Sequence, residues 1–331
     1  MKVRATAVVL MTLLAACTSA SSSSLTTFPT GSPTPSSPVP TIVPTRPIAG
    51  VGNPGSIVAG FGSIWVQSGM GSLVHIPSDG VGGGTIPDVL PRAAKAAPQP
   101  LAVGFGSVWS LDGNAVVRID PTTDQPSARI PVPSPTSAIT TGGGAVWVAC
   151  CPGAPELLRI DPATNAAKVV GPATATSGGG LAYGFGSLWW INFSEAPSIS
   201  RLDPATAHET AFITTPGYAA FVVAAPSCIW TIGRDGRVAQ IDPSTDRVVG
   251  VGRKAPSAFG ASTSDGIVWI NDGGLLGFVA STGEVVVRRP SSGHQPKRTS
   301  AGVAQLGPYV WLADPARDRV VAIPVSVSGG S

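Results

Sequence analysis

The hexapeptide GFGSIW at residues 60–65 returns as GFGSVW at 104–109 and as GFGSLW at 184–189. The tryptophans that end these segments belong to a longer series, with spacings between 38 and 44 residues: Trp65, Trp109, Trp147, Trp189, Trp230, Trp269 and Trp311. Only Trp190 falls outside it. A near-constant period of about 40 residues is typical of propellers and solenoids. The spacing therefore predicts a repeat protein with seven units.

Each unit has the same internal order. An apolar pair leads into a glycine-rich turn, a strand that carries the tryptophan, a second strand such as VVRID, and a last strand. The turn before the last strand is Asp-Pro-x-Thr at 120–123, 161–164, 203–206 and 242–245, where proline fixes φ and aspartate accepts a backbone N–H. No helical periodicity interrupts the strands. The pattern predicts an all-β protein, a seven-bladed β-propeller of four-stranded antiparallel blades.

In such a ring the GFGS segment is predicted to be the hairpin between the two innermost strands of a blade, with its glycines at the positions of positive φ. The tryptophan is then expected to fill the wedge between adjacent blades. Both expectations give the repeated hexapeptide a structural role.

The last blade needs a strand from the other end of the chain. The seventh repeat supplies only three strands, in SAGVAQ, YVWLAD and RVVAIPV. RPIAGVGNPGSIVAGFGSIW (46–65) aligns with ARIPVPSPTSAITTGGGAVW (128–147), which gives residues 47–52 an outermost-strand position without a blade of their own. Because an unsealed blade leaves open strand edges, we expect residues 47–52 to pair with residues 319–324 and to close the ring.

The N-terminal residues predict an address outside the cytoplasm. A basic start precedes an apolar run over residues 5–16 that is too short to span a bilayer. Leu-Ala-Ala-Cys at 14–17 resembles the bacterial lipoprotein cleavage box, which implies a signal peptide over 1–16 and a lipid on Cys17 that anchors the protein to the outer side of the cell membrane. The alternative is a plain secretory signal with a chance cysteine.

Residues 17–46 are rich in Ser, Thr and Pro and are predicted to be a disordered tether before a propeller at 47–331, because they cannot bury enough apolar surface to offset their ordering entropy. The net charge of the whole chain is +3. Without Lys2 and Arg4 the chain has 19 basic and 18 acidic residues, so no general basic field indicates nucleic acid. We expect a monomer without a cofactor.

The repeats, of the form GxGSxW…VxRIDPxT…I, resemble the YVTN-type and virginiamycin-B-lyase-like seven-bladed propellers of bacteria over residues 47–331. The resemblance implies the fold. The lyases use a His and Glu constellation with a metal, and the three histidines of this chain do not match it: His75 is predicted on a third strand, His208 at the start of a fourth and His294 in a loop. We therefore expect no metal site.

Two groups of side chains allow more than one interpretation. Cys150 and Cys151 could form a vicinal disulfide, but buried free thiols, with Cys228, are the simpler interpretation because no histidine supports a metal site. Arg118, Arg159 and Arg201 recur at one position in three successive blades. They would form either a ring of ligand-binding groups or, as we favour, ion pairs between blades.

The loops between second and third strands and the loops between blades are predicted to share one face, where propellers usually bind. The polar residues of the first set are Asp112, Asn114, Asn192, Glu195, Arg234, Asp235, Asn271, Asp272, Asp314 and Arg317. Arg253 and Lys254 follow blade five, and His294, Lys297 and Arg298 follow blade six. Together with Asn271 and Asp272 they form the candidate ligand site.

The five basic residues of that site predict a local patch for an anionic partner, such as an envelope polymer, a lipid headgroup or a partner protein. The simpler alternative is a solvated loop whose charges only aid solubility. The favoured function is a lipid-anchored, extracytoplasmic binding or scaffold module. The alternative is a propeller enzyme, a lyase or lactone hydrolase, with acidic or histidine side chains that converge at the channel mouth.

Overall fold

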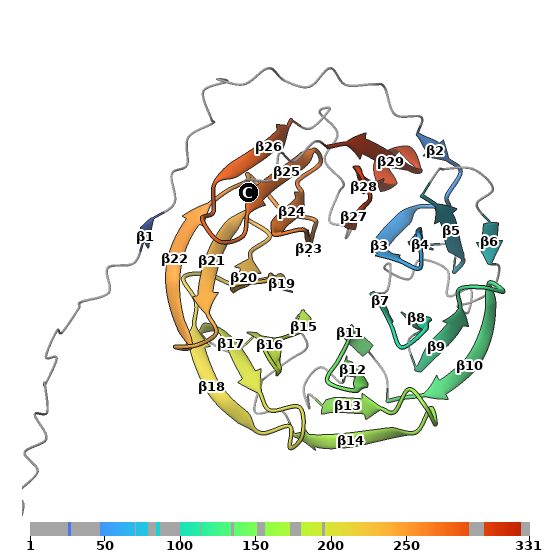
Figure 1. Cartoon of the computed structure of the whole chain (residues 1–331), viewed down its shortest axis with the longest axis horizontal. Helices are drawn as coiled ribbons and strands as arrows, with labels where there is room; N and C mark the ends of the chain where they lie inside the picture. Colours follow the sequence, from blue (N-terminus) through green and yellow to red (C-terminus); the bar gives the residue numbers. More distant parts are fainter. Residues whose placement is uncertain are drawn as a thin grey trace, which may run out of the picture.

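Seven β-sheets stand around a central axis and follow one another in chain order (Figure 1). The structure is a computed structural model that describes residues 26–27, 47–69, 71–78, 84–86, 100–112, 114–133, 136–150, 156–172, 180–193, 196–290 and 301–325. Each blade has four antiparallel strands, numbered outward from the axis. The prediction of an all-β, seven-bladed propeller is confirmed.

The first four blades hold sixteen strands. Blade 1 has β3 (Pro54–Gly60), β4 (Ser63–Ser68), β5 (Leu73–Pro77) and β6 (Gly84–Ile86). Blade 2 has β7 (Leu101–Gly104), β8 (Ser107–Leu111), β9 (Ala115–Asp120) and β10 (Gln125–Pro131). Blade 3 has β11 (Thr136–Gly142), β12 (Ala145–Cys150), β13 (Glu156–Ile160) and β14 (Ala167–Pro172). Blade 4 has β15 (Leu181–Gly184), β16 (Ser187–Phe193), β17 (Pro197–Leu202) and β18 (Glu209–Thr214).

The last three blades complete the ring. Blade 5 has β19 (Phe221–Ala224), β20 (Ile229–Ile232), β21 (Arg237–Asp242) and β22 (Arg247–Arg253). Blade 6 has β23 (Gly260–Ser264), β24 (Ile267–Asn271), β25 (Leu275–Val279) and β26 (Val285–Arg289). Blade 7 has β27 (Val303–Leu306), β28 (Tyr309–Asp314), the 3-10 helix η1 (Pro315–Arg317), β29 (Arg319–Pro324) and the N-terminal β2 (Ile48–Ala49).

Because neighbouring strands of a blade are antiparallel, its connections divide between two faces of the ring. The upper face carries the loops between second and third strands and the connections from one blade to the next. The lower face carries the turns between first and second strands and between third and fourth strands. This division places the predicted loop sites on the upper face and the repeated GFGS turns on the lower face.

The second strand of each blade carries the tryptophan of the repeat, and all seven are buried. In blades 1 to 6 their exposed fraction is 0%. In blade 1, Trp65 lies in a cluster with Leu101 and Val108 of blade 2, so it fills the space between the two sheets. In blade 4, Trp189 packs likewise with Val222 and Ile229 of blade 5. The predicted role of these side chains as fillers between blades agrees with these contacts.

The GFGS turn joins the two innermost strands, as predicted, but its first glycine does not supply a positive φ. In blade 1 the two positive-φ residues of this turn are Phe61 (56°) and Gly62 (72°), which suits a two-residue hairpin turn. Gly60 serves another purpose, because a Cβ there would lie 3.0 Å from Val103 of blade 2. The first glycine therefore permits close approach of the next blade.

The predicted closure of the ring is confirmed. Strand β2 pairs antiparallel with β29, with Ile48 opposite Val320 and Ala49 opposite Arg319. The backbone N–H of Gly50 donates to the carbonyl of Asp318 at 3.0 Å, and the backbone N–H of Asn53 donates to the Asp318 carboxylate at 2.6 Å. N-terminal and C-terminal segments thus share one blade.

A short strand lies within the predicted tether. Thr26–Thr27 forms β1, which pairs in parallel with Gly250 and Val251 of β22 on the outer edge of blade 5 (Figure 1). Cys17 and the remaining residues of the signal peptide and tether lie outside the described residues. Within the part of the chain that is described, no helix has the length and apolar character needed to cross a membrane.

Candidate binding face

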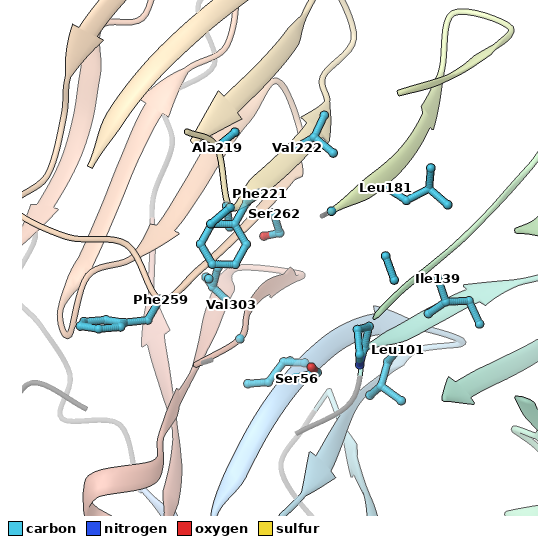
Figure 2. Close-up of a pocket in the computed structure, with 18 of the residues that line it drawn as sticks. Ser56, Leu101, Ile139, Leu181, Ala219, Phe221, Val222, Phe259, Ser262 and Val303 are labelled. Atoms are coloured by element: carbon cyan, nitrogen blue, oxygen red, sulfur yellow. The ribbon is translucent and has the colours of Figure 1, made fainter. Parts of the chain in front are cut away.

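The upper face opens into a cavity of about 660 Å³ on the axis of the ring. All seven blades line it with residues at or beside the start of their innermost strands, so the cavity is the upper part of the central channel. Figure 2 shows apolar side chains from different blades around it, among them Leu101, Ile139, Leu181, Val222 and Val303. A concave, mostly apolar site of this size is typical of small-molecule binding.

One charged residue, Arg234, contributes to the described lining of this cavity. It lies on the loop between β20 and β21, and its guanidinium lies 5.8 Å from the centre of the Phe221 ring. No acidic side chain of the described residues forms an ion pair with Arg234. Phe221 itself begins the innermost strand of blade 5 and lines the cavity (Figure 2). The cavity therefore combines an apolar wall with one exposed cation.

Two further arginines lie beside Arg234 on the upper face of blade 5. Arg237 and Arg253 are directly opposite each other on β21 and β22, an arrangement of like charges that destabilises a sheet. Asp235 offsets part of this charge, since its carboxylate lies 3.3 Å from Nε of Arg237. Arg253 instead donates from Nε to the backbone carbonyl of Asp235 at 2.9 Å. We call Arg234, Arg237 and Arg253 the blade 5 arginine cluster.

The sequence identified only part of this cluster. Arg234 and Arg253 were expected on the loop face, whereas Arg237 was not, because it belongs to a strand. Antiparallel pairing of RVAQID with RVVGVGR across the Asp-Pro-Ser-Thr turn would have placed it opposite Arg253. Phe221 and Tyr218 of the channel mouth were also missed, since nothing in a single apolar strand shows which end meets the axis.

Lys254 turns away from the expected patch. Its ammonium donates to the carbonyl of Gly283 in blade 6 at 2.6 Å and lies 5.8 Å from the ring of Phe278. Burial lowers the pKa of this lysine, because the charged form loses hydration. Its contacts join blades 5 and 6. The other three basic residues of the predicted patch, His294, Lys297 and Arg298, lie outside the described residues.

Asn271 and Asp272 are both buried and bonded within the protein. The Asn271 amide donates to the carbonyl of Ala313 at 3.0 Å, and its oxygen accepts the backbone N–H of Gly273. Asp272 lies 3.3 Å from Arg288 on the outermost strand of its own blade. The desolvation caused by burial raises the pKa of Asp272, although the Arg288 charge opposes this shift. Their contacts support the structure of blades 6 and 7.

An equivalent ion pair in blade 2 shows that the Asp272 contact belongs to the fold. Asp112 stands three residues after its tryptophan, as Asp272 does, and pairs with Arg129 on the outermost strand of the same blade. Burial raises the pKa of Asp112 as well, against the lowering effect of Arg129. In blade 7, Asp314 holds the same position and accepts from Arg319 at 2.9 Å.

Of the three recurring arginines, Arg201 forms the ion pair between blades that the sequence favoured, Arg118 joins blades through neutral acceptors, and Arg159 forms no ion pair with a described residue. Arg118 stacks on Trp109, with 5.0 Å to the ring centre, and donates to the carbonyl of Pro162 in blade 3 at 2.7 Å. Arg201 stacks on Trp189 and forms an ion pair of 2.9 Å with Asp246 of blade 5. The partner that Arg118 finds at the corresponding turn position is the amide of Asn165 rather than an aspartate.

His75 holds the same position in blade 1. It stacks on Trp65 with ring centres 4.3 Å apart, and its Nδ1 lies 2.9 Å from the carboxylate of Asp124 in blade 2. Its other ring nitrogen lies 2.7 Å from the hydroxyl of Ser63. Through these contacts His75 links blades 1 and 2. Cys150 and Cys228 are buried, and Cys151 lies outside the described residues.

No acid–base pair converges on the described part of the channel mouth, where Tyr218 and Arg234 are the titratable residues that line the cavity. Among the described residues, no group of three His, Cys, Asp or Glu side chains is arranged to hold a metal ion. The enzyme alternative therefore has no candidate pair there. What the mouth offers is an apolar surface with an arginine at its rim.

Comparisons with known proteins support the fold. No protein-family model and no curated protein matches the sequence. Among solved structures, the β-propeller domain of Cps50 (Swd1) from Myceliophteria thermophila is similar, with a TM-score of 0.66, 12% identity, and coverage of 86% of this chain and 100% of that one. The structure of U3-55K has a TM-score of 0.68 at 11% identity and covers 85% of this chain and 98% of that one. At such identity the similarity concerns the β-propeller fold alone.

Proposed function

We propose that this protein is an extracytoplasmic binding module, anchored to the cell membrane by a lipid on Cys17, that binds an anionic partner on its upper face. The β-propeller fold is consistent with a binding or scaffold module. The proposed partner is an anionic polymer of the cell envelope. The anchor rests on the Leu-Ala-Ala-Cys pattern at residues 14–17 and on the apolar run before it.

The blade 5 arginine cluster carries the proposal for the binding face. Arg237 and Arg253 face each other across two strands, and Arg234 lies on the loop that β21 continues. Asp235 offsets only part of this charge, so the cluster keeps a local positive charge that an anion would neutralise. Because the chain as a whole is nearly neutral, the attraction would be local and would weaken as salt screens it.

The positions of the N-terminal strands support this arrangement. Both β1 and β2 lie on the outer edge of the ring, away from the channel (Figure 1). An anchor attached before β1 therefore leaves the channel mouth open to a partner. If β1 stays paired, residues 18–25 alone span the gap to the membrane, about 25 Å when extended at roughly 3.1 Å per residue.

Membrane fractionation tests the anchor. The Cys17→Ser variant should leave the membrane fraction or accumulate as an unprocessed precursor, whereas Cys228→Ser, which removes a buried thiol, should fractionate like the parent. A Cys17→Ser protein with the parent's distribution and migration would contradict lipid anchoring.

Binding to soluble polyphosphate at low and high salt tests the face. The parent should bind at low salt and release at high salt. Changing Arg237 and Arg253 together to Gln should weaken binding at low salt by about tenfold, since each loses a charge-assisted contact. The Arg247→Gln variant, at the lower end of the same β22, is the matched control. A second variant, in which Lys254, Lys297 and Arg298 are all changed to Ala, measures how much the predicted loop patch contributes to polyphosphate binding. Equal binding by all of these proteins would contradict the proposed site.

A further inference from the structure

The channel cavity adds a second chemical requirement to the ligand. Arg234 is at once a member of the arginine cluster and a lining residue of the cavity, whose remaining described lining is uncharged. A purely polar anion would satisfy the arginine but would leave the apolar wall in contact with water. The observed combination suits a molecule with an anionic head and an apolar body.

We propose that the channel mouth binds an amphiphilic anion, with its carboxylate or phosphate on Arg234 and its hydrocarbon part inside the channel. This inference rests on the proposed function, because it specifies a ligand for the same face. The lining repeats small and aliphatic side chains from blade to blade, which leaves the cavity wide enough for a flexible chain. Phe221 holds the guanidinium beside the entrance.

The height of the channel suits an extended chain. Its walls are the innermost strands, which have four to seven residues in the seven blades. At about 3.3 Å per residue the walls are roughly 13–23 Å tall. Leu181, Ile139 and Val303 line the upper part of this channel, where they would contact the first methylene groups of a hydrocarbon chain that enters from the upper face.

One polar group in the wall has no partner. The hydroxyl of Ser262 is buried at the atomic level and has no hydrogen bond in the described structure. It lines the cavity beside Phe221 (Figure 2), whereas Ser137, another hydroxyl of the lining, donates to the carbonyl of Ala149. The Ser262 oxygen has almost no accessible surface, so it does not itself face a molecule in the cavity. Ser262 is one of the lining residues and therefore offers a position at which a larger side chain narrows the cavity.

Calorimetric titration of the full chain with fatty acid anions tests this inference. Dodecanoate should bind with a stoichiometry of one, and each methylene removed in the series to hexanoate should weaken binding by about fourfold. Dodecyltrimethylammonium has the same chain and the opposite charge, so it should bind far more weakly. Equal binding of the cation and the anion would overturn the assignment of the head group to Arg234.

Variants locate the site. Arg234→Gln should weaken dodecanoate binding by about tenfold, and Arg247→Gln, far from the channel, should leave it unchanged. Ser262→Leu should weaken binding by narrowing the cavity. Leu181→Phe is a second block from another blade, in case the first variant does not fold. Dodecanoate that binds equally to parent, blocked and Arg234→Gln proteins would refute a site in the channel.

The two proposals fail in different ways. If polyphosphate binds the arginine cluster but dodecanoate binds no form of the protein, the upper face is correct and the channel inference is wrong. If dodecanoate binds in the channel but polyphosphate does not bind, the proposal of an amphiphilic ligand is supported and the proposal of an envelope polymer as partner is wrong.

Discussion

Blades 1 to 4 and blades 5 to 7 bury the same tryptophan but satisfy its indole N–H in different ways. In the first group the indole donates to the backbone carbonyl five residues earlier, at 2.9 to 3.1 Å: Gly60, Gly104, Gly142 and Gly184. Trp230 instead donates to the carbonyl of Ala280 in blade 6. Trp269 donates both to the hydroxyl of Ser264 in its own blade at 3.1 Å and to Gln305 of blade 7 at 2.9 Å. The Trp311 indole has no hydrogen bond in the described structure.

The difference follows from one position in the sequence. Blades 1 to 4 have glycine five residues before the tryptophan, where blades 5 to 7 have Ala225, Ser264 and Leu306. A Cβ at Gly104 would lie 2.7 Å from Thr141, and one at Gly184 would lie 2.5 Å from Ala224. Glycine therefore lets the next blade approach at this point. Without it, the acceptor of the indole N–H is no longer the backbone carbonyl of that position: it is Ala280 of the next blade for Trp230, and side chains of blades 6 and 7 for Trp269. The ring itself stays buried in every blade.

The side-chain connection from one blade to the next also varies around the ring. His75, Arg118, Arg201 and Gln240 each reach the lower turn of the next blade. The corresponding residues of blades 6 and 7 are Gly277 and Ala322, which have no such group. There, Gln305 joins blade 6 to blade 7, and β2 with Asp318 joins blade 7 to the N-terminal segment. The last blades thus rely on fewer and less regular contacts.

The largest effect is expected from removing the closing strand. Deletion of residues 47–52 should lower the free energy of unfolding by about 3–5 kcal/mol, because it removes the buried Val51, the partly buried Ile48 and the pairing with β29. Urea denaturation measures the loss. Deletion of residues 30–40 is the control and should leave the transition unchanged. Equal losses in both variants would contradict closure by β2.

A smaller effect should separate the two groups of blades. Trp109→Phe leaves the carbonyl of Gly104 without its donor and should cost about 2–3 kcal/mol. Trp311→Phe removes an indole that has no hydrogen bond in the described structure, so it should cost less than about 1.5 kcal/mol. Urea midpoints at equal m-value provide the comparison. The same cost in blades 2 and 7 would show that the indole bond does not distinguish them.

The smallest effect concerns Asp272 and its counterpart Asp112. Because burial raises the pKa of both carboxyls, the stability linked to their protonation is fully present below the ordinary pKa of 3.8 and is lost as pH rises through the folded-state pKa. The stability of Asp272→Asn or Asp112→Asn relative to that of the parent should therefore be higher at pH 7 than at pH 4. The difference should stay within about 1 kcal/mol, and Tm measured across this range detects it. A difference that does not vary with pH would contradict the burial cost.

Local patterns made the ring predictable. The spacing of tryptophans, the Asp-Pro-x-Thr turns and the surplus strand at residues 47–52 are all properties of short segments, and they gave the blade number and the closure. The turn geometry was predicted less well, since Phe61 accepts a φ that the sequence assigned to glycine. Phe61, Phe105 and Phe185 remain 40 to 47% exposed on the lower face. Packing therefore does not explain why these turn positions hold phenylalanine.

The candidate site was harder to predict because it depends on which strand ends meet at the axis. Arg253 was identified from its loop, yet Arg237 and Phe221 join it only through strand register and the closure of the ring. Asn271 and Asp272 had the composition of a site but are held by contacts within blades 6 and 7. Composition of a loop does not show whether its side chains face solvent or the next blade.

Hydrogen exchange of the full chain, measured with and without soluble polyphosphate, tests the central claim that the upper face of blade 5 is the binding face. The account predicts slower exchange at residues 216–222, 233–237 and 253–257, and unchanged exchange at the lower-face turns 61–63, 105–107 and 185–187. Protection of those lower-face turns, with no change at residues 233–237, would contradict it.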